Sequence, residues 1–219
     1  MPSQVPQHLT SAEKVILALR TAITTGELSA GTQIRQEEIA TQYKVSRMPV
    51  REAFRQLEAE GLLAVYPGRG AFVTRLTADE IREIYDIRIL LECDAIRRAV
   101  PALTPTILQE AETLFTKLEQ AQDGQTFGPL DEAFHATLYA PAQRPRLLDL
   151  INTQRNQVTQ FLYAAAPLTA YRDGAMADHR QILDACHAGD VVAAVAAVES
   201  HLRNSVQIAV ESSQVTVER

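Results

Sequence analysis

The stretch VSRMPVREAFRQLEAEGLL, residues 45–63, decides the fold of the first third of this chain. Arg47, Arg51 and Arg55 recur in it at four-residue intervals, and residues four apart share one face of a helix. The apolar residues of the stretch fall on the opposite, inward side: Val50, Phe54, Leu57 and Leu62. The spacing therefore predicts an amphipathic helix that presents a stripe of arginines.

Two helical patterns precede this stretch and a hairpin follows it. Thr10 and Glu13 have the spacing of a capping box, and Ser46 suits the N-cap of the arginine helix. After that helix, two β-prone runs flank a Pro-Gly-rich tip, which predicts a hairpin. The expected elements are helices over 10–25, 34–43 and 46–60 and strands over 63–66 and 71–74.

This order of elements describes a winged helix-turn-helix, in which the helix after the turn enters the DNA major groove. Arginine's planar fork grips a phosphate or the O6/N7 edge of guanine, and Arg47 and Arg51 lie nearest the helix N-terminus. Arg55 lies further along and suits a phosphate contact or an acidic neighbour. The other reading is a solvated face on which arginine and glutamate side chains simply pair.

Charge is distributed unevenly along the chain, whose formal net charge is -6. Residues 1–76 hold nine Lys/Arg and seven Asp/Glu, whereas residues 77–219 hold twelve and twenty. The acidic part would repel nucleic acid, so contact with DNA has to be local. Double-stranded DNA is thus expected to meet the N-terminal part alone.

Composition favours a helical protein of the cytoplasm. Hydrophobic residues make up 46% of the chain and aromatic residues only 5%, so the core is built from Ala, Leu, Ile and Val. Cys93 and Cys186 make no disulfide framework and are expected to be reduced and buried. No apolar run approaches the ~20 residues of a membrane span, and no signal-peptide pattern opens the chain.

From Thr77 onward the pattern is helical to near the C-terminus. This predicts a mostly α fold of two domains, a winged helix-turn-helix over 1–76 and an all-helical antiparallel bundle over 77–219. Thr77 with Glu80 forms another capping box, and Asp190 could cap the last helix. The six expected helices cover 77–100, 104–122, 127–140, 144–165, 170–188 and 190–213.

One carboxylate and three imidazoles in the second domain are candidate metal ligands. Asp131 and His135 lie one helical turn apart, while His179 and His201 belong to two further helices. Oxygen and nitrogen donors from several helices of a bundle suit Zn, Ni, Mn or Fe. A lone histidine is more often a surface or satisfied core residue, so spacing by itself leaves both readings open.

The run IRQEEIATQYKVSRMPVREAFRQLEAEGLLAVYPGRGAFV, residues 34–73, resembles the DNA-binding domain of the GntR family of bacterial transcription regulators. By this resemblance the DNA contacts are made by Arg35, Arg47, Arg51, Gly68, Arg69 and Gly70. The position of Arg55 on the arginine stripe adds it to this set. Met48 stands where Thr is commoner in the family. It lies on the DNA side of the first turn and leaves the base preference open.

Residues 77–214 resemble FCD, the all-helical ligand-binding domain of the FadR-type branch, in its six-helix, VanR-like version. In similar proteins Asp-x3-His, a later His and a His after a Gly-Asp turn hold the metal. The residues that match are Asp131, His135, His179 and His201, with Gly189-Asp190 as the turn. The resemblance implies a divalent transition metal, Zn or Ni ahead of Mn or Fe.

Arg88 falls where similar proteins place an arginine that faces the ligand pocket. A buried guanidinium needs an anion, which a small carboxylate effector would supply. The alternative is that Arg88 pairs with Glu92 or with Asp131. The family pattern is also broken at Gln143-Arg144, where a Gly-Asn pair is common, which puts the pocket contribution of that loop in question.

The function expected from the sequence is a ligand-responsive repressor that binds a palindromic operator as a homodimer, and not an enzyme. The rival is a metal-dependent hydrolase or lyase that uses Asp131 and the three histidines to activate water. A third reading makes the metal a structural staple of the bundle.

Overall fold

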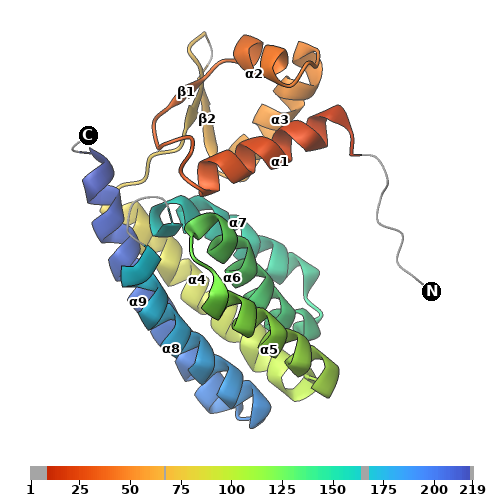
Figure 1. Cartoon of the computed structure of the whole chain (residues 1–219), viewed down its shortest axis with the longest axis vertical. Helices are drawn as coiled ribbons and strands as arrows, with labels where there is room; N and C mark the ends of the chain where they lie inside the picture. The colour runs from red at the N-terminus through yellow and green to blue at the C-terminus, as the bar shows by residue number, and fades with distance from the viewer. Residues whose placement is uncertain (1–8, 67, 164–167, 218–219) are drawn as a thin grey trace. The chain divides into compact units, whose positions relative to one another are not determined.

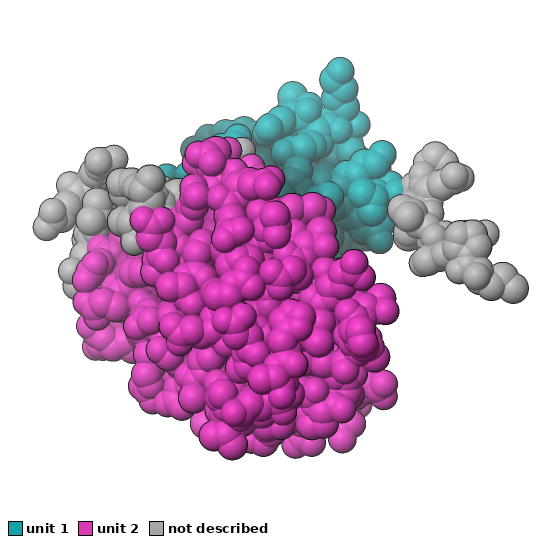
Figure 2. All heavy atoms as spheres, turned by 60° about the horizontal axis from the view of Figure 1, so that its bottom comes forward, with its two compact units in different colours: residues 1–75 teal, residues 76–219 magenta. Residues whose placement is uncertain are grey.

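The computed structural model describes residues 9–66, 68–163 and 168–217, which form two compact units, residues 1–75 and 76–219 (Figures 1 and 2). The prediction of a mostly α fold, with a winged helix-turn-helix followed by an all-helical domain, is confirmed. Two predicted features, Pro67 of the hairpin tip and the end of the helix expected over 144–165, lie outside the described residues.

Unit 1 builds its core from the apolar faces of three helices and a small sheet. The Thr10–Glu13 capping box is formed, whereas Ser46 stands at the N-cap of the third helix without a capping hydrogen bond from its side chain. The third helix buries Val50 and Phe54 in this core. The elements are α1 Ser11–Thr24, β1 Gln33–Ile34, α2 Gln36–Gln42, α3 Arg47–Ala59, β2 Leu63–Tyr66 and β3 Gly70–Val73.

The sheet is antiparallel, with the strand order β1-β3-β2. Strand β1 was not predicted, because two residues carry no readable alternation. It has a clear task in the wing: the Gln33 side-chain amide donates to the Arg69 carbonyl oxygen over 2.7 Å and so fastens the tip. Gly68 and Gly70 take φ values of +74° and +91°, a region that glycine enters without steric cost.

Unit 2 is a bundle of six α-helices in the part of the chain that is described, in the number predicted. Helix α4 packs against α9 and α7, α8 packs against α9, and α5 packs against α6 (Figure 1). The helices are α4 Ala78–Ala99, α5 Pro105–Gln120, α6 Gly124–Tyr139, α7 Pro145–Tyr163, α8 Leu168–His187 and α9 Val191–Val217, with 3-10 turns at Val100–Ala102 and Ala140–Ala142.

The caps of these helices follow simple chemistry. The Thr77–Glu80 capping box is formed, and Asp190 accepts a hydrogen bond from the Ala193 amide over 3.0 Å. Helix α6 starts at Gly124, earlier than the predicted start at residue 127, because Asp123 caps it by accepting from the Thr126 amide. Pro129 lies inside this helix.

Gln143 takes the left-handed conformation, with φ at 51°, directly after the turn that ends α6. Glycine occupies that region without strain, so the Gly-Asn pair of the family pattern would suit this backbone conformation. The departure from the family pattern at Gln143 therefore concerns the backbone conformation first.

Both thiols are free and buried, and burial raises the pKa of Cys93 to about 11 and that of Cys186 to about 12. They are protonated at neutral pH, as expected for small buried side chains. Among the described helices, none has the length and apolarity to cross a membrane.

Candidate DNA-binding surface and metal centre

Helix α3 divides its residues cleanly between core and solvent. Its buried residues are Val50, Ala53, Phe54 and Leu57. Arg47, Arg51 and Arg55 are all exposed on the other side, as the four-residue spacing predicts. Two glutamates that could have neutralised Arg55 have other partners. Glu60 pairs with Arg20 at 2.6 Å, and the Glu58 carboxylate accepts from the Val65 amide over 3.3 Å.

The arginines nearest the start of α3 differ in their neighbours. Arg47 lies 3.3 Å from the Glu37 carboxylate, and both side chains are mostly exposed, so this ion pair is weak. The Arg51 guanidinium donates to the Met48 sulfur over 3.2 Å. Arg35, at the N-cap of α2, lies 3.7 Å from Glu38 and is also exposed. All these cations remain available to an outside anion.

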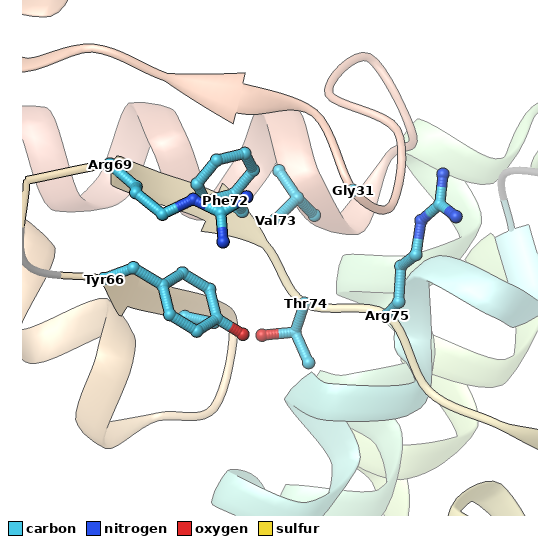
Figure 3. A pocket seen from close by; sticks show the side chains of 8 residues that line it. Gly31, Tyr66, Arg69, Phe72, Val73, Thr74 and Arg75 are labelled. Carbon is cyan, nitrogen blue, oxygen red and sulfur yellow. The ribbon is translucent and has the colours of Figure 1, made fainter.

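The wing adds a hollow of about 520 Å³ beside its tip (Figure 3). Tyr66, Arg69 and Phe72 line it, and the two aromatic rings meet edge to face with centroids 5.7 Å apart. An exposed arginine beside a half-exposed tyrosine at a glycine-rich tip suits contact with a sugar–phosphate backbone. The structure thus brings the predicted tip residues to one exposed edge of unit 1.

The predicted metal ligands meet inside unit 2. Asp131 and His135 come from α6, His179 from α8 and His201 from α9, and one ligand atom from each lies within 4.8 Å of all the others. Asp131 Oδ1 lies 3.0 Å from His179 Nε2 and 3.7 Å from His135 Nε2, and the two Nε2 atoms are 3.2 Å apart. All four side chains are buried.

The environment keeps two of these imidazoles neutral. Burial lowers the pKa of His135 well below its usual range, and it lowers the pKa of His179 as well. Burial alone would raise the pKa of Asp131, yet its hydrogen bond with His179 and the charge of Arg155 hold that pKa well below the usual range. Neutral imidazoles and an ionised carboxylate are the forms that bind metals.

A second layer of polar groups holds His135 in place. The Tyr139 hydroxyl donates to Glu92 Oε2 over 3.0 Å and lies 3.3 Å from His135 Nδ1. If the Tyr139 hydroxyl oxygen accepts a hydrogen bond from His135 Nδ1–H, the Nε2 lone pair of His135 is directed at the cluster. Glu92 is fully buried and also accepts from Arg88 Nε over 2.8 Å.

Arg88 therefore has a protein partner, Glu92, which is one of the two alternatives named in the sequence analysis. Its guanidinium lies over the Tyr85 ring, 4.6 Å from the centroid, and its side chain is 4% exposed. A direct contact between Arg88 and an effector remains a prediction.

Arg155 of α7 is the functional candidate that the sequence analysis missed. Its Nη2 donates to Asp131 Oδ2 over 2.7 Å, and its Nη1 lies 3.8 Å from Glu92. The spacing Ile151, Arg155, Val158 follows the buried face of α7, so helical periodicity could have placed this arginine in the core.

Asp178, the residue before His179, lies behind the fourth candidate ligand, His201. Its Oδ2 lies 3.6 Å from His201 Nδ1 and accepts from the Asn204 side chain over 3.0 Å. Burial would raise the pKa of Asp178, but the facing His201 and Asn204 lower it, so the carboxylate is ionised. A carboxylate behind a ligating histidine orients the ring and raises its basicity.

A cavity of about 200 Å³ opens beside the cluster between α6 and α7. His135, Tyr139 and Arg155 contribute polar groups to its wall, together with Glu132 and Asn152. Leu148 and Ile151 supply apolar surface. Arg88 is not among its lining residues. A small molecule with one polar end could therefore meet Arg155 and the cluster at once.

The donor set fits a divalent transition metal. One carboxylate oxygen and three imidazole nitrogens are the ligand types that Zn, Ni, Mn and Fe accept, and they already converge. The charge balance adds a condition. Arg88 and Arg155 offset Glu92 and Asp131, so a divalent cation would leave two uncompensated positive charges, of which Asp178 at the edge offsets one. An anionic co-ligand would complete the balance.

Comparison with known proteins agrees with both halves of this description. Residues 11–73 match the family described as "Bacterial regulatory proteins, gntR family", and residues 83–204 match the "FCD domain". The "HTH-type transcriptional repressor RspR" of Escherichia coli is 27% identical over 87% of this chain and 85% of its own length.

A second relative and a solved structure are also similar to this chain. The "Probable D-xylose utilization operon transcriptional repressor" of Paenarthrobacter nicotinovorans is 33% identical over 82% of this chain and 80% of its own length. The solved structure of E. coli McbR/YncC has a TM-score of 0.83 and 25% identity, covering 93% of this chain and 99% of that one. The chain therefore belongs to the gntR family of bacterial transcription regulators, in the FadR-type branch that carries an FCD domain.

Proposed function

We propose that this protein is a cytoplasmic, metal-containing repressor that binds a palindromic operator as a homodimer and releases it when a small carboxylate enters unit 2. The charge balance of the buried cluster carries the proposal. A divalent metal held by Asp131 and the three histidines calls for an anion, and Arg155 lies beside the cavity that would admit one. The metal would supply a Lewis acid to which a carboxylate oxygen binds.

Operator binding is assigned to the exposed side of α3 and to the wing. Arg47 and Arg51 would reach base edges or phosphates, while Arg55, Arg35 and Arg69 would neutralise the backbone. Gly68 and Gly70 let the wing tip approach closely. Two-fold operator symmetry would require two copies of unit 1, which is the reason for proposing a homodimer.

The route from effector to operator runs along α4. This helix begins at Ala78, shortly after the last strand of the wing ends at Val73, and it carries Glu92. Glu92 contacts both Tyr139 and Arg155, which line the effector cavity. An effector that draws Arg155 away from Glu92 would shift α4 and with it the spacing of the two DNA-binding heads. Because half-site spacing must match, a small shift weakens binding.

The test uses an operator selected from random duplex DNA with the full-length protein. Fluorescence anisotropy then measures operator affinity for chelator-treated protein, for protein reloaded with Zn or Ni, and for reloaded protein with a panel of small mono- and dicarboxylic acids. We expect at least one acid to weaken operator binding about tenfold or more, and only in metal-loaded protein. No response to any acid in either state would contradict the effector part of the proposal.

A hydrolase or lyase built on the same cluster is the rival function. It needs a general base beside the metal, and two buried carboxylates near the cluster already have partners. Glu92 accepts from Arg88 and Tyr139, and Asp178 accepts from Asn204. Turnover of the same acids by metal-loaded protein, followed by NMR, separates the two functions. Product formation that depends on the metal would favour the enzyme.

A further inference from the structure

Met48 is a large apolar side chain on the face of α3 that otherwise carries arginines. It is 55% exposed, whereas Val50 and Phe54 on the other face are 0% and 3% exposed. The core of unit 1 is formed without Met48. Its position in the first turn, between Arg47 and Arg51, places it on the proposed DNA-reading surface.

Arg47 and Arg51, the first two arginines of α3, have different neighbours. Arg51 Nη2 donates to the Met48 sulfur over 3.2 Å, while Arg47 faces the Glu37 carboxylate at 3.3 Å. A thioether is an uncharged, weak acceptor, so it orients the Arg51 fork without neutralising it. The terminal methyl of Met48 is bonded to the same sulfur and therefore lies close to that fork.

The apolar feature that the major groove offers is the C5-methyl group of thymine. A threonine at this place, commoner in similar sequences, could form a hydrogen bond, whereas methionine offers a methyl group and a soft sulfur. We propose that Met48 is a specificity-determining residue that packs on a thymine methyl next to the base pair contacted by Arg51. This inference rests on the proposed use of α3 in operator binding.

The experiment alters the two sides of the proposed contact separately: the thymine methyl group on the DNA and the Met48 side chain on the protein. Each thymine of the selected duplex is replaced in turn by deoxyuridine, which lacks only the C5-methyl group, and affinities are measured for wild type, Met48→Ala and Met48→Leu. We expect wild type to lose about fourfold in affinity at one thymine of each half-site, the value for burying one methyl group. Met48→Ala should show no loss at that thymine, and Met48→Leu should keep most of it.

Because Met48 is exposed, all three proteins should melt at the same temperature, and the other thymines serve as internal controls. The inference is overturned if no thymine is sensitive in wild type, or if Met48→Ala keeps the full penalty. Failure of the proposed function looks different. In that case wild type selects no sequence, or Arg51→Ala binds the selected duplex as well as wild type does.

Discussion

The arginines of the two candidate sites differ in burial and pairing. In unit 1 the arginines of α3 stand in water, and a weak ion pair such as Arg47–Glu37 leaves them available. In unit 2, Arg88 and Arg155 are buried, and each has a carboxylate partner at 2.7–2.8 Å. The exposed charges contribute little to folding and can serve recognition. The buried charges bind each other, so the proposed effector would have to enter their network to act.

Asp131→Ala should have the largest effect, because it breaks the buried network. It leaves Arg155 without its closest carboxylate and removes one ligand of the predicted metal site. We expect a loss of about 3–5 kcal/mol in the free energy of unfolding, measured by urea titration in the presence of chelator.

The matched control is Glu132→Ala, the exposed neighbour on the same helix. It should change stability by less than about 0.5 kcal/mol. Equal stabilities for the two variants would show that the buried cluster is not held by charge pairing.

Asp178→Asn tests whether a buried carboxylate outside the four candidate metal ligands supports the site. The carboxylate facing His201 Nδ1 is lost while its shape is kept. Zinc affinity, measured by competition with a chromogenic chelator, should fall about 10- to 100-fold. Asp173→Asn, an exposed change on the same helix, should bind zinc as wild type does; an unaltered affinity in Asp178→Asn would remove Asp178 from the site.

Thr77→Ala probes an exposed hydrogen-bond network on α4, the helix that also carries Arg88 and Glu92. Thr77 caps this helix through the Glu80 amide, and Glu80 accepts from Thr77 in return. The loss of the cap should cost about 1 kcal/mol of stability, measured by urea titration at pH 7. A loss as large as that of Asp131→Ala would contradict the ranking of buried over exposed polar groups.

The same cap predicts a pH dependence. The backbone amide and hydroxyl of Thr77 lower the pKa of Glu80 below its unfolded value, so this carboxylate stabilises the fold at neutral pH and loses that effect as pH falls through its folded pKa. The stability difference between wild type and Glu80→Gln should therefore be larger at pH 7 than at pH 4. A difference that grew on acidification would have the wrong sign.

Glu37→Gln should have the smallest effect on folding. The pair with Arg47 is exposed, so stability should change by less than about 0.5 kcal/mol. Operator affinity should instead rise by roughly twofold to fivefold, because a negative charge is removed beside Arg47. Anisotropy at constant salt measures this, and an unchanged or weaker affinity would separate Glu37 and Arg47 from the DNA interface.

The same contrast explains what could be predicted from the sequence. The arginine stripe could be predicted from helical periodicity alone, because a helix places residues four apart on one face whatever surrounds it. The convergence of Asp131 with the three histidines rested on family resemblance, since spacing along the chain does not say which helices pack together. Strand β1 was missed because it exists only through pairing with β3.

Pairing among buried polar groups was the hardest part to predict. Arg155 and Asp131 are brought together by the packing of α7 on α6, and nothing local in either segment signals it. Arg88 had two possible partners in the sequence, and the choice of Glu92 depends on rotamers inside the core. Exposed charges need no such information, because water is their main partner.

The most direct test of the account is the operator affinity of the Arg47→Ala/Arg51→Ala double variant beside wild type, measured by anisotropy at one salt concentration. The account predicts a loss of about 100-fold or more with an unchanged melting temperature, since both side chains are exposed. Operator binding equal to that of wild type would contradict it.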